Sequence, residues 1–149
     1  MSVDQQTSGS PPRRRGRLFV VASPIGNLAD ISPRARQALE QADLVAAEDT
    51  RRTGRLLEHL GVRRPMLSCH RFNEARSIER LLEVLERGET LALISDGGTP
   101  TISDPGYRLV AEAARLGHQV IPIPGPSAVI ASLSVAGLPA DRLYFAGFL

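Results

Sequence analysis

Short apolar runs alternate with segments of helical periodicity along nearly the whole chain, and this alternation constrains the fold more than any other feature. The apolar runs predict strands over residues 18–22, 44–47, 66–69, 90–94, 120–123 and 143–148. Between them, apolar residues at helical spacing predict helices over residues 33–41, 50–60, 75–87, 107–116 and 127–136. Strands that alternate with helices form parallel sheets through right-handed crossovers. We therefore expect an α/β fold, a parallel-sheet three-layer domain with helices on both faces.

Length and composition exclude several classes of protein. The 149 residues suit one domain with its own core, and 42% of them are hydrophobic. No apolar run approaches the length of a membrane span, and the first residues lack the apolar region of a signal peptide. Cys69 is the only cysteine, so no intrachain disulfide can form, as is usual in the cytosol. These observations predict a cytoplasmic protein with no membrane partner.

The two ends of the chain differ from the rest. Residues 1–17 are rich in Ser, Pro, Gly and Arg and predict a disordered basic leader, which leaves a domain over residues 18–149. The leader is either an arm that holds RNA phosphates or a solvated extension, and the sequence leaves both roles open. The apolar run at 143–148 is followed by no polar tail, so we expect the chain to be the first domain of a longer protein.

Most of the candidate functional residues lie in four turns, each directly after a predicted strand: 23–27, 48–52, 96–106 and 124–128. The carboxyl ends of parallel strands meet at one edge of a sheet, which is where α/β proteins bind ligands. In the longest turn, Gly97 and Gly98 let the backbone approach a ligand closely. Asp104 and Pro105 there predict the N-cap and first residue of the next helix.

Two common nucleotide-binding motifs are absent. The chain contains no lysine, which excludes a phosphate-binding P-loop, and the first turn lacks the dinucleotide pattern G-x-G-x-x-G. The turns instead favour a ligand held by backbone amides, carbonyls and one or two carboxylates. The sequence shows no His, Cys or Asp spacing typical of a metal site, so we expect no bound metal.

Four motifs make the chain similar to the N-terminal half of the tetrapyrrole-methylase-type, S-adenosylmethionine-dependent methyltransferases: Ser23-Pro24-Ile25-Gly26-Asn27-Leu28, Ala47-Glu48-Asp49-Thr50-Arg51, Ser95–Gly106 and Ala136-Gly137-Leu138-Pro139. Within that family the chain most resembles the bacterial enzymes that methylate a ribose 2′-hydroxyl of a cytidine in small-subunit (16S) ribosomal RNA. The resemblance covers residues 18–149. It implies that S-adenosylmethionine binds between two α/β domains, that the partner is the small (30S) ribosomal subunit, and that the longer protein is a homodimer.

The resemblance also assigns residues to the cofactor. It implies contacts from the first turn, from the glycine loop and from the turn after the fifth strand: Pro24, Gly97, Gly98, Thr99, Ile102, Ser127 and Ala128. The wider family often has Gly-Asp-Pro where this chain has Gly98-Thr99-Pro100, so a carboxylate is missing there. Asp96 is expected to take over part of that polar role.

The remaining polar residues have alternative interpretations. Glu48 and Asp49 are either a catalytic base and the group that orients it, or acids that favour a helix N-terminus. Asn27 is a candidate substrate contact, and Asp104 is either an N-cap or a substrate contact. Two rival functions also stay open: methylation of a porphyrin or corrin precursor, and binding without turnover by an inactive truncated domain. The resemblance places half of the cleft outside this chain, so we expect the chain alone to be inactive.

Overall fold

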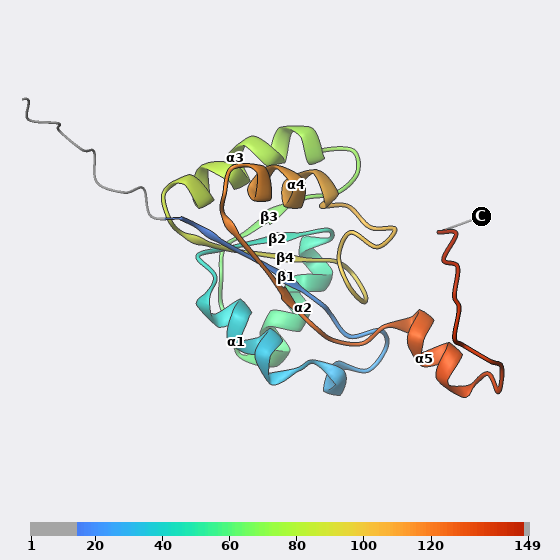
Figure 1. The fold of residues 1–149 in the computed structure, drawn as a ribbon. Helices are drawn as coiled ribbons and strands as arrows, with labels where there is room; N and C mark the ends of the chain where they lie inside the picture. The colour runs from blue at the N-terminus through green and yellow to red at the C-terminus, as the bar shows by residue number, and fades with distance from the viewer. Residues whose placement is uncertain (1–14, 148–149) are drawn as a thin grey trace, which may run out of the picture.

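The computed structural model describes residues 15–147, so most of the predicted basic leader, residues 1–14, lies outside the described residues. The predicted α/β fold is confirmed (Figure 1). Its elements are β1 (Arg17–Val21), η1 (Leu28–Asp30), α1 (Pro33–Gln41), β2 (Leu44–Ala47), α2 (Thr50–Leu60), β3 (Met66–Ser68), α3 (Glu74–Glu86), β4 (Thr90–Ile94), α4 (Tyr107–Arg115), β5 (Gln119–Ile123) and α5 (Ala128–Val135). β1 begins at Arg17, inside the range assigned to the leader.

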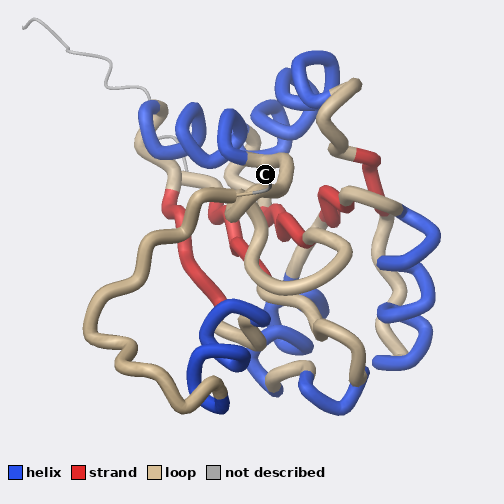
Figure 2. The backbone as a smooth tube through the Cα atoms, turned by 90° about the vertical axis from the view of Figure 1, so that its right-hand side faces the viewer, coloured by secondary structure: helices blue, strands red, loops and turns tan. Residues whose placement is uncertain are grey.

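The five strands form one parallel sheet in the order β3-β2-β4-β1-β5. β4 and β1 lie at the centre, which explains why the whole of β4 is buried. Because all the strands run in the same direction, their carboxyl ends lie at one edge. Figure 2 views the molecule from that side, with helices above and below the strands and loops toward the viewer.

Alternate residues of the central strands face opposite layers of helices. On β4, Ala92 and Ile94 belong to the core with α1 and α2, whereas Leu91 and Leu93 belong to the core with α3 and α4. Figure 1 shows the same division, with α1 and α2 below the sheet and α3 and α4 above it. Two apolar cores, one on each face, therefore make the predicted three-layer domain.

The entrance to α4 differs from the prediction. The helix begins at Tyr107 with Gly106 as its N-cap, so the prediction that Asp104 and Pro105 open it was wrong. Gly106 has φ +110°, and a Cβ there would lie 2.6 Å from Leu93 Cδ2 in the core. The chain must turn sharply against a buried leucine before it enters the helix. That packing requirement, rather than the capping propensity of aspartate, fixes the start of the helix.

The predicted strand over residues 143–148 was also wrong, at least over the described residues 143–147. Those residues form no regular structure, and Tyr144 is 90% exposed. A strand needs a hydrogen-bonded neighbour, and within residues 15–147 no strand pairs with this segment. α5 likewise has no buried residue. Figure 1 shows α5 and the segment after it running apart from the sheet.

Candidate functional site

The first turn and the glycine loop are joined by a short two-stranded contact. Ser23 N donates to Gly98 O at 2.9 Å, and Gly98 N donates to Ser23 O at 3.1 Å. The Ser23 hydroxyl also donates to Ser95 O at 2.9 Å. The predicted convergence of these turns at the carboxyl edge is therefore confirmed for the turns after β1 and β4.

One pocket, of about 260 Å³, opens beside the glycine loop and will be called the glycine-loop pocket. It brings together residues from the first turn, the glycine loop, the start of α5 and the segment after it: Ile25, Gly97, Gly98, Thr99, Ile102, Ser103, Asp104, Ser127, Ala128, Val129 and Phe145. Most of the residues predicted to contact the cofactor thus lie around one cavity. Asp104, which does not cap α4, also lines the glycine-loop pocket.

The other two predicted cofactor residues line a second pocket on the far side of the Ser23–Gly98 contact. This pocket has a volume of about 250 Å³, and its walls come from the first turn, α2 and the end of β4: Ser23, Pro24, Leu28, Arg52, Thr53, Arg55, Leu56, Ser95 and Asp96. It will be called the α2 pocket. The two pockets meet through consecutive residues, since Asp96 lines one and Gly97 lines the other.

The backbone of the glycine loop is shaped for close approach. Gly98 has φ +80°, a left-handed conformation that disfavours every residue with a Cβ. A Cβ there would lie 3.8 Å from Ile25 Cγ2 and 3.9 Å from Pro126 O, which is ordinary contact. Its two neighbours, Gly97 and Thr99, are exposed. Among the described residues, no hydrogen bond engages their N–H groups, so both can donate to a ligand.

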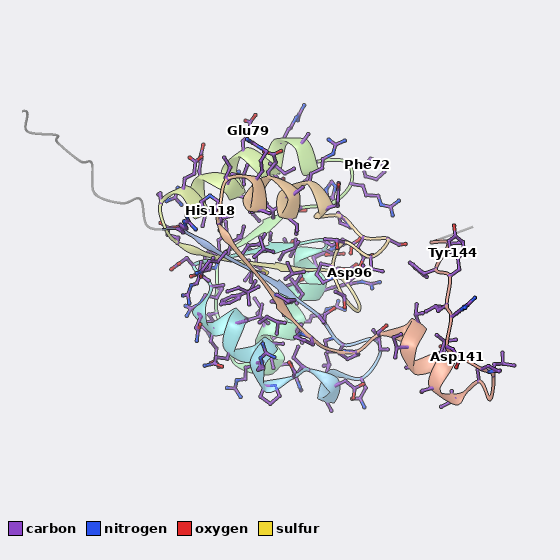
Figure 3. All side chains as sticks on the ribbon, viewed as in Figure 1. Phe72, Glu79, Asp96, His118, Asp141 and Tyr144 are labelled. Atoms are coloured by element: carbon purple, nitrogen blue, oxygen red, sulfur yellow. The ribbon has the colours of Figure 1, made fainter. Side chains whose placement is uncertain are left out.

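Two carboxylates from different turns, those of Glu48 and Asp96, lie together at the carboxyl edge of the sheet, and this part of the edge will be called the rim. Asp96 lines the α2 pocket, whereas Glu48 lines neither pocket. Glu48 Oε2 accepts a hydrogen bond from Asp96 N at 3.2 Å. Burial raises the pKa of Glu48, and the nearby negative charges of Asp96 and Asp104 add to that rise. Burial likewise raises the pKa of Asp96, although Arg52 Nε lies 3.6 Å from its Oδ2 and opposes the rise. Figure 3 shows Asp96 at this edge of the sheet.

Asp49 and Asn27 serve as local caps. Asp49 Oδ1 accepts a hydrogen bond from Arg51 N at 2.8 Å at the start of α2. Nη2 of the Arg51 guanidinium lies 3.2 Å from Asp49 Oδ2. These hydrogen bonds to Arg51 lower the pKa of Asp49. Asn27 Oδ1 accepts from Ala29 N at 3.0 Å and caps η1. Neither residue lines the two pockets, and their catalytic and substrate roles stay predictions.

Two arginines that the sequence did not single out complete the rim. Arg52 pairs with Asp96, and Arg71 Nη2 donates to Ser103 O at 2.7 Å, which links the turn after β3 to the glycine loop. Both contacts join segments far apart in the chain, so no local spacing could have indicated them. Within residues 15–147, no cluster of three or more His, Cys, Asp or Glu side chains could hold a metal ion. No helix there is both long and apolar enough to cross a bilayer.

Residues 17–147 match the family model of the tetrapyrrole (corrin/porphyrin) methylases. The chain belongs to this family. Curated relatives named "Ribosomal RNA small subunit methyltransferase I" are 57% identical over 134 residues in Pseudomonas aeruginosa and 50% identical over 140 residues in Escherichia coli O157:H7. The alignments cover 90% and 94% of this chain and 48% and 49% of those proteins. This tetrapyrrole methylase chain therefore spans about half the length of the relatives it matches.

A solved structure shows the same fold. The crystal structure of uroporphyrin-III-C-methyltransferase from Thermus thermophilus superposes with a TM-score of 0.61 at 23% sequence identity. The superposition covers 86% of this chain and 55% of the other. In this tetrapyrrole methylase domain, the two pockets at the carboxyl edge thus lie on a fold that is shared with a protein of low sequence identity.

The raised pKa of Glu48 leads to a stability prediction for this tetrapyrrole methylase domain. The folded chain holds the Glu48 proton more tightly than the unfolded chain, so stability falls as pH rises from the ordinary value of 4.5 through the folded pKa. Glu48→Gln keeps an acceptor for Asp96 N but removes the charge. We expect it to raise the free energy of unfolding at neutral pH, and with it the melting temperature, by less than about 1 kcal/mol because water screens this half-buried group.

Asp49→Asn is the matched comparison because its sign is opposite. The lowered pKa of Asp49 contributes stability above the ordinary value of 3.8, and that contribution is lost as pH falls. The asparagine variant should therefore melt below the unchanged chain at neutral pH and approach it in acid. Thermal melts across this pH range measure both effects. If Glu48→Gln loses stability at neutral pH while keeping its native circular dichroism, the assigned environment of Glu48 is wrong.

Proposed function

We propose that this chain is the N-terminal half of an S-adenosylmethionine-dependent methyltransferase that methylates a ribose 2′-hydroxyl of a cytidine in small-subunit ribosomal RNA. The observation that carries the proposal is the 50–57% identity, over 90% or more of the chain, to relatives named "Ribosomal RNA small subunit methyltransferase I". The two pockets at the carboxyl edge support it. We further propose that the longer protein is a cytoplasmic homodimer that acts on the small ribosomal subunit.

The residues of the glycine-loop pocket fit the chemistry of S-adenosylmethionine. The exposed N–H groups of Gly97 and Thr99 can donate to its polar atoms, and Ile102 offers an apolar contact. Ser127 and Ala128 close the other wall. The carboxylate of Asp96, which lines the α2 pocket, suits a ligand with positive charge. Pro24 and Asp96 extend the proposed cofactor contacts into the α2 pocket.

When bound, S-adenosylmethionine supplies an electrophilic methyl group on a sulfonium. The protein's task is then to position the nucleophile and to accept its proton. Glu48 suits the second role better than Asp49. Its raised pKa makes its carboxylate the stronger base, and only one of its oxygens accepts from Asp96 N. Asp49 is instead engaged by Arg51 at the start of α2. We propose that Asp49 fixes the direction of the turn and that Glu48 accepts the hydroxyl proton.

A hybrid enzyme tests the proposed function. It consists of this chain followed by the C-terminal half of the Pseudomonas aeruginosa relative. We expect the hybrid to transfer methyl groups from S-adenosylmethionine to small ribosomal subunits that lack this modification, and not to uroporphyrinogen. The chain alone should transfer none, because pockets that hold small molecules well bury most of the ligand surface, and on this proposal the second domain of the cleft is not part of this chain.

Two results would contradict the proposal. One is a folded hybrid that methylates uroporphyrinogen rather than the ribosomal subunit. The other is a hybrid that binds S-adenosylmethionine in calorimetry but modifies neither substrate. Mapping of the modified nucleotide by mass spectrometry then tests the cytidine 2′-hydroxyl specifically. The hybrid with Glu48→Gln should bind the cofactor normally and methylate more slowly, which separates the role of the base from binding.

A further inference from the structure

The turn between β3 and α3 presents an aromatic ring to solvent. Phe72 is 99% exposed, more than any other large hydrophobic side chain among the described residues. Its ring meets the imidazole of His70 edge-on, with the centroids 6.1 Å apart. Figure 3 shows Phe72 on the same side of the molecule as Asp96. An apolar ring is thus held in water at the edge of the sheet that carries the two pockets.

The turn that carries Phe72 is tightly hydrogen-bonded. Asn73 Oδ1 accepts from His70 N at 2.8 Å, and Asn73 Nδ2 donates to Ser68 O at 3.0 Å. Phe72 N donates to His70 Nδ1 at 3.2 Å. These bonds fix the backbone on both sides of the ring. The backbone that carries the ring is therefore ordered before a partner binds, so binding does not have to order the turn.

Arg71 connects this turn to the candidate site. Its Nη2 donates to Ser103 O at 2.7 Å, and Ser103 lines the glycine-loop pocket. The charge of Arg71 also acts on Glu48, where it opposes the rise in the pKa of that carboxyl. Arg71 is exposed, so its remaining N–H groups face water. The aromatic ring, a guanidinium and the proposed catalytic rim therefore belong to one continuous surface.

The chemistry of this surface selects its partner. A docking site for an apolar protein surface needs several neighbouring hydrophobic side chains, but Phe72 stands between Arg71 and Asn73. An exposed ring with an arginine as its neighbour in the chain instead offers an unpaired RNA base a stacking surface and a positive charge. The ring stacks on the base, and the arginine stacks beside it or binds the phosphate. Among acidic neighbours such as Glu48 and Asp96, Arg71 also supplies the positive charge that a phosphate requires.

We propose that Phe72 and Arg71 form a stacking platform for an unpaired base of the RNA substrate, next to the nucleotide that enters the site. The choice of RNA as the substrate class rests on the proposed function. The platform holds the strand from outside the pockets, through a residue that contacts neither cofactor nor reacting atoms. On this proposal, Phe72 contributes to the binding of the RNA substrate and not to the methyl-transfer step.

Fluorescence can report on this contact directly, because the chain contains no tryptophan. Phe72→Trp introduces one indole in the turn between β3 and α3. A single-stranded RNA hexamer should quench the emission of this indole when a base stacks on the ring. Leu116→Trp is the matched control, since Leu116 is also exposed but follows α4 at the opposite edge of the sheet. Its emission should not change. A hexamer of abasic nucleotides should quench neither variant, which separates stacking from phosphate contact.

Affinity measurements on the chain give the size of the contribution that Phe72 makes to RNA binding. Phe72→Ala should weaken binding of the hexamer by about fivefold to hundredfold, the loss that follows from removing one base–aromatic stack. Phe72→Tyr should restore it, and Arg71→Gln should reduce the dependence of binding on salt. Unchanged circular dichroism establishes that the variants fold. If Phe72→Ala binds the hexamer as tightly as the unchanged chain, or if Phe72→Trp is quenched equally by the abasic strand, the proposal is overturned.

The outcome is separable from that of the proposed function, because this assay needs neither cofactor nor turnover. A hybrid enzyme that methylates ribosomal subunits, combined with RNA binding that ignores Phe72, would refute the platform alone. RNA binding that depends on Phe72, combined with a hybrid that binds the cofactor but methylates nothing, would refute the methyltransferase assignment alone. In an active hybrid, Phe72→Ala should raise KM for the ribosomal subunit and leave kcat nearly unchanged.

Discussion

Gly98→Val is expected to abolish binding of S-adenosylmethionine by the hybrid enzyme while leaving the domain folded. The valine Cβ would fit between Ile25 and Pro126 O at ordinary contact distances, so its methyl groups would extend into the glycine-loop pocket and occupy ligand space. The left-handed backbone adds strain on the order of 1–3 kcal/mol, which a domain of ordinary stability tolerates. Calorimetric titration with the cofactor measures the loss.

Gly117→Val separates strain from the loss of ligand space. Gly117 has φ +79°, nearly the same as Gly98, but nothing lies within 4 Å of a Cβ there. It belongs to the turn between α4 and β5, at the opposite edge of the sheet. This variant should lose a similar amount of stability and keep its full affinity for the cofactor. Equal affinities for Gly98→Val and the unchanged hybrid would show that the cofactor does not occupy the glycine-loop pocket.

Gly106→Ala is expected to destabilise the domain by about 2–5 kcal/mol, as the sum of backbone strain and overpacking of the core. The alanine Cβ would lie 2.6 Å from Leu93 Cδ2, and Leu93 is only 2% exposed, so it has little room to move. Unfolding by urea, followed by circular dichroism, measures the change in the free energy of unfolding.

Gly117→Ala again supplies the comparison, with an expected cost of about 1–2 kcal/mol from strain alone. Combining Gly106→Ala with Leu93→Ala should relieve the clash, so the double variant should be more stable than the sum of the single effects predicts. Strict additivity in this cycle would mean that the two side chains do not compete for the same space. It would also remove the packing explanation for the start of α4.

The type and order of the elements could be predicted because each carries its own periodic pattern. The helix predicted over residues 75–87 is α3, Glu74–Glu86, since its apolar residues repeat at helical spacing. The order of the strands in the sheet was not predictable in the same way. Nothing local in residues 90–94 shows that β4 pairs with both β1 and β2. That order is fixed by packing between distant segments.

The candidate site was predictable to a similar extent. Gly98 and Ser127 meet around one pocket because both follow parallel strands, and this was expected. The contacts of Arg52 and Arg71 were not expected, because an ion pair or a long-range hydrogen bond leaves no spacing in the sequence. The predicted strand over residues 143–148 was wrong over the described residues 143–147 for a related reason. A pattern of apolar residues indicates a strand only where a neighbouring strand is available to pair with it.

The strand order has a consequence for how the chain reaches its fold. Arg17 and Thr90 are paired neighbours in the finished sheet, yet they are 73 positions apart in the chain. During synthesis, β1 leaves the ribosome long before either of its two partners, β4 and β5, has been made. β1 therefore has no strand partner until β4 has emerged, and it is paired on both sides only after β5 follows. Such non-local pairing slows folding and prolongs the interval in which a chaperone can bind that strand.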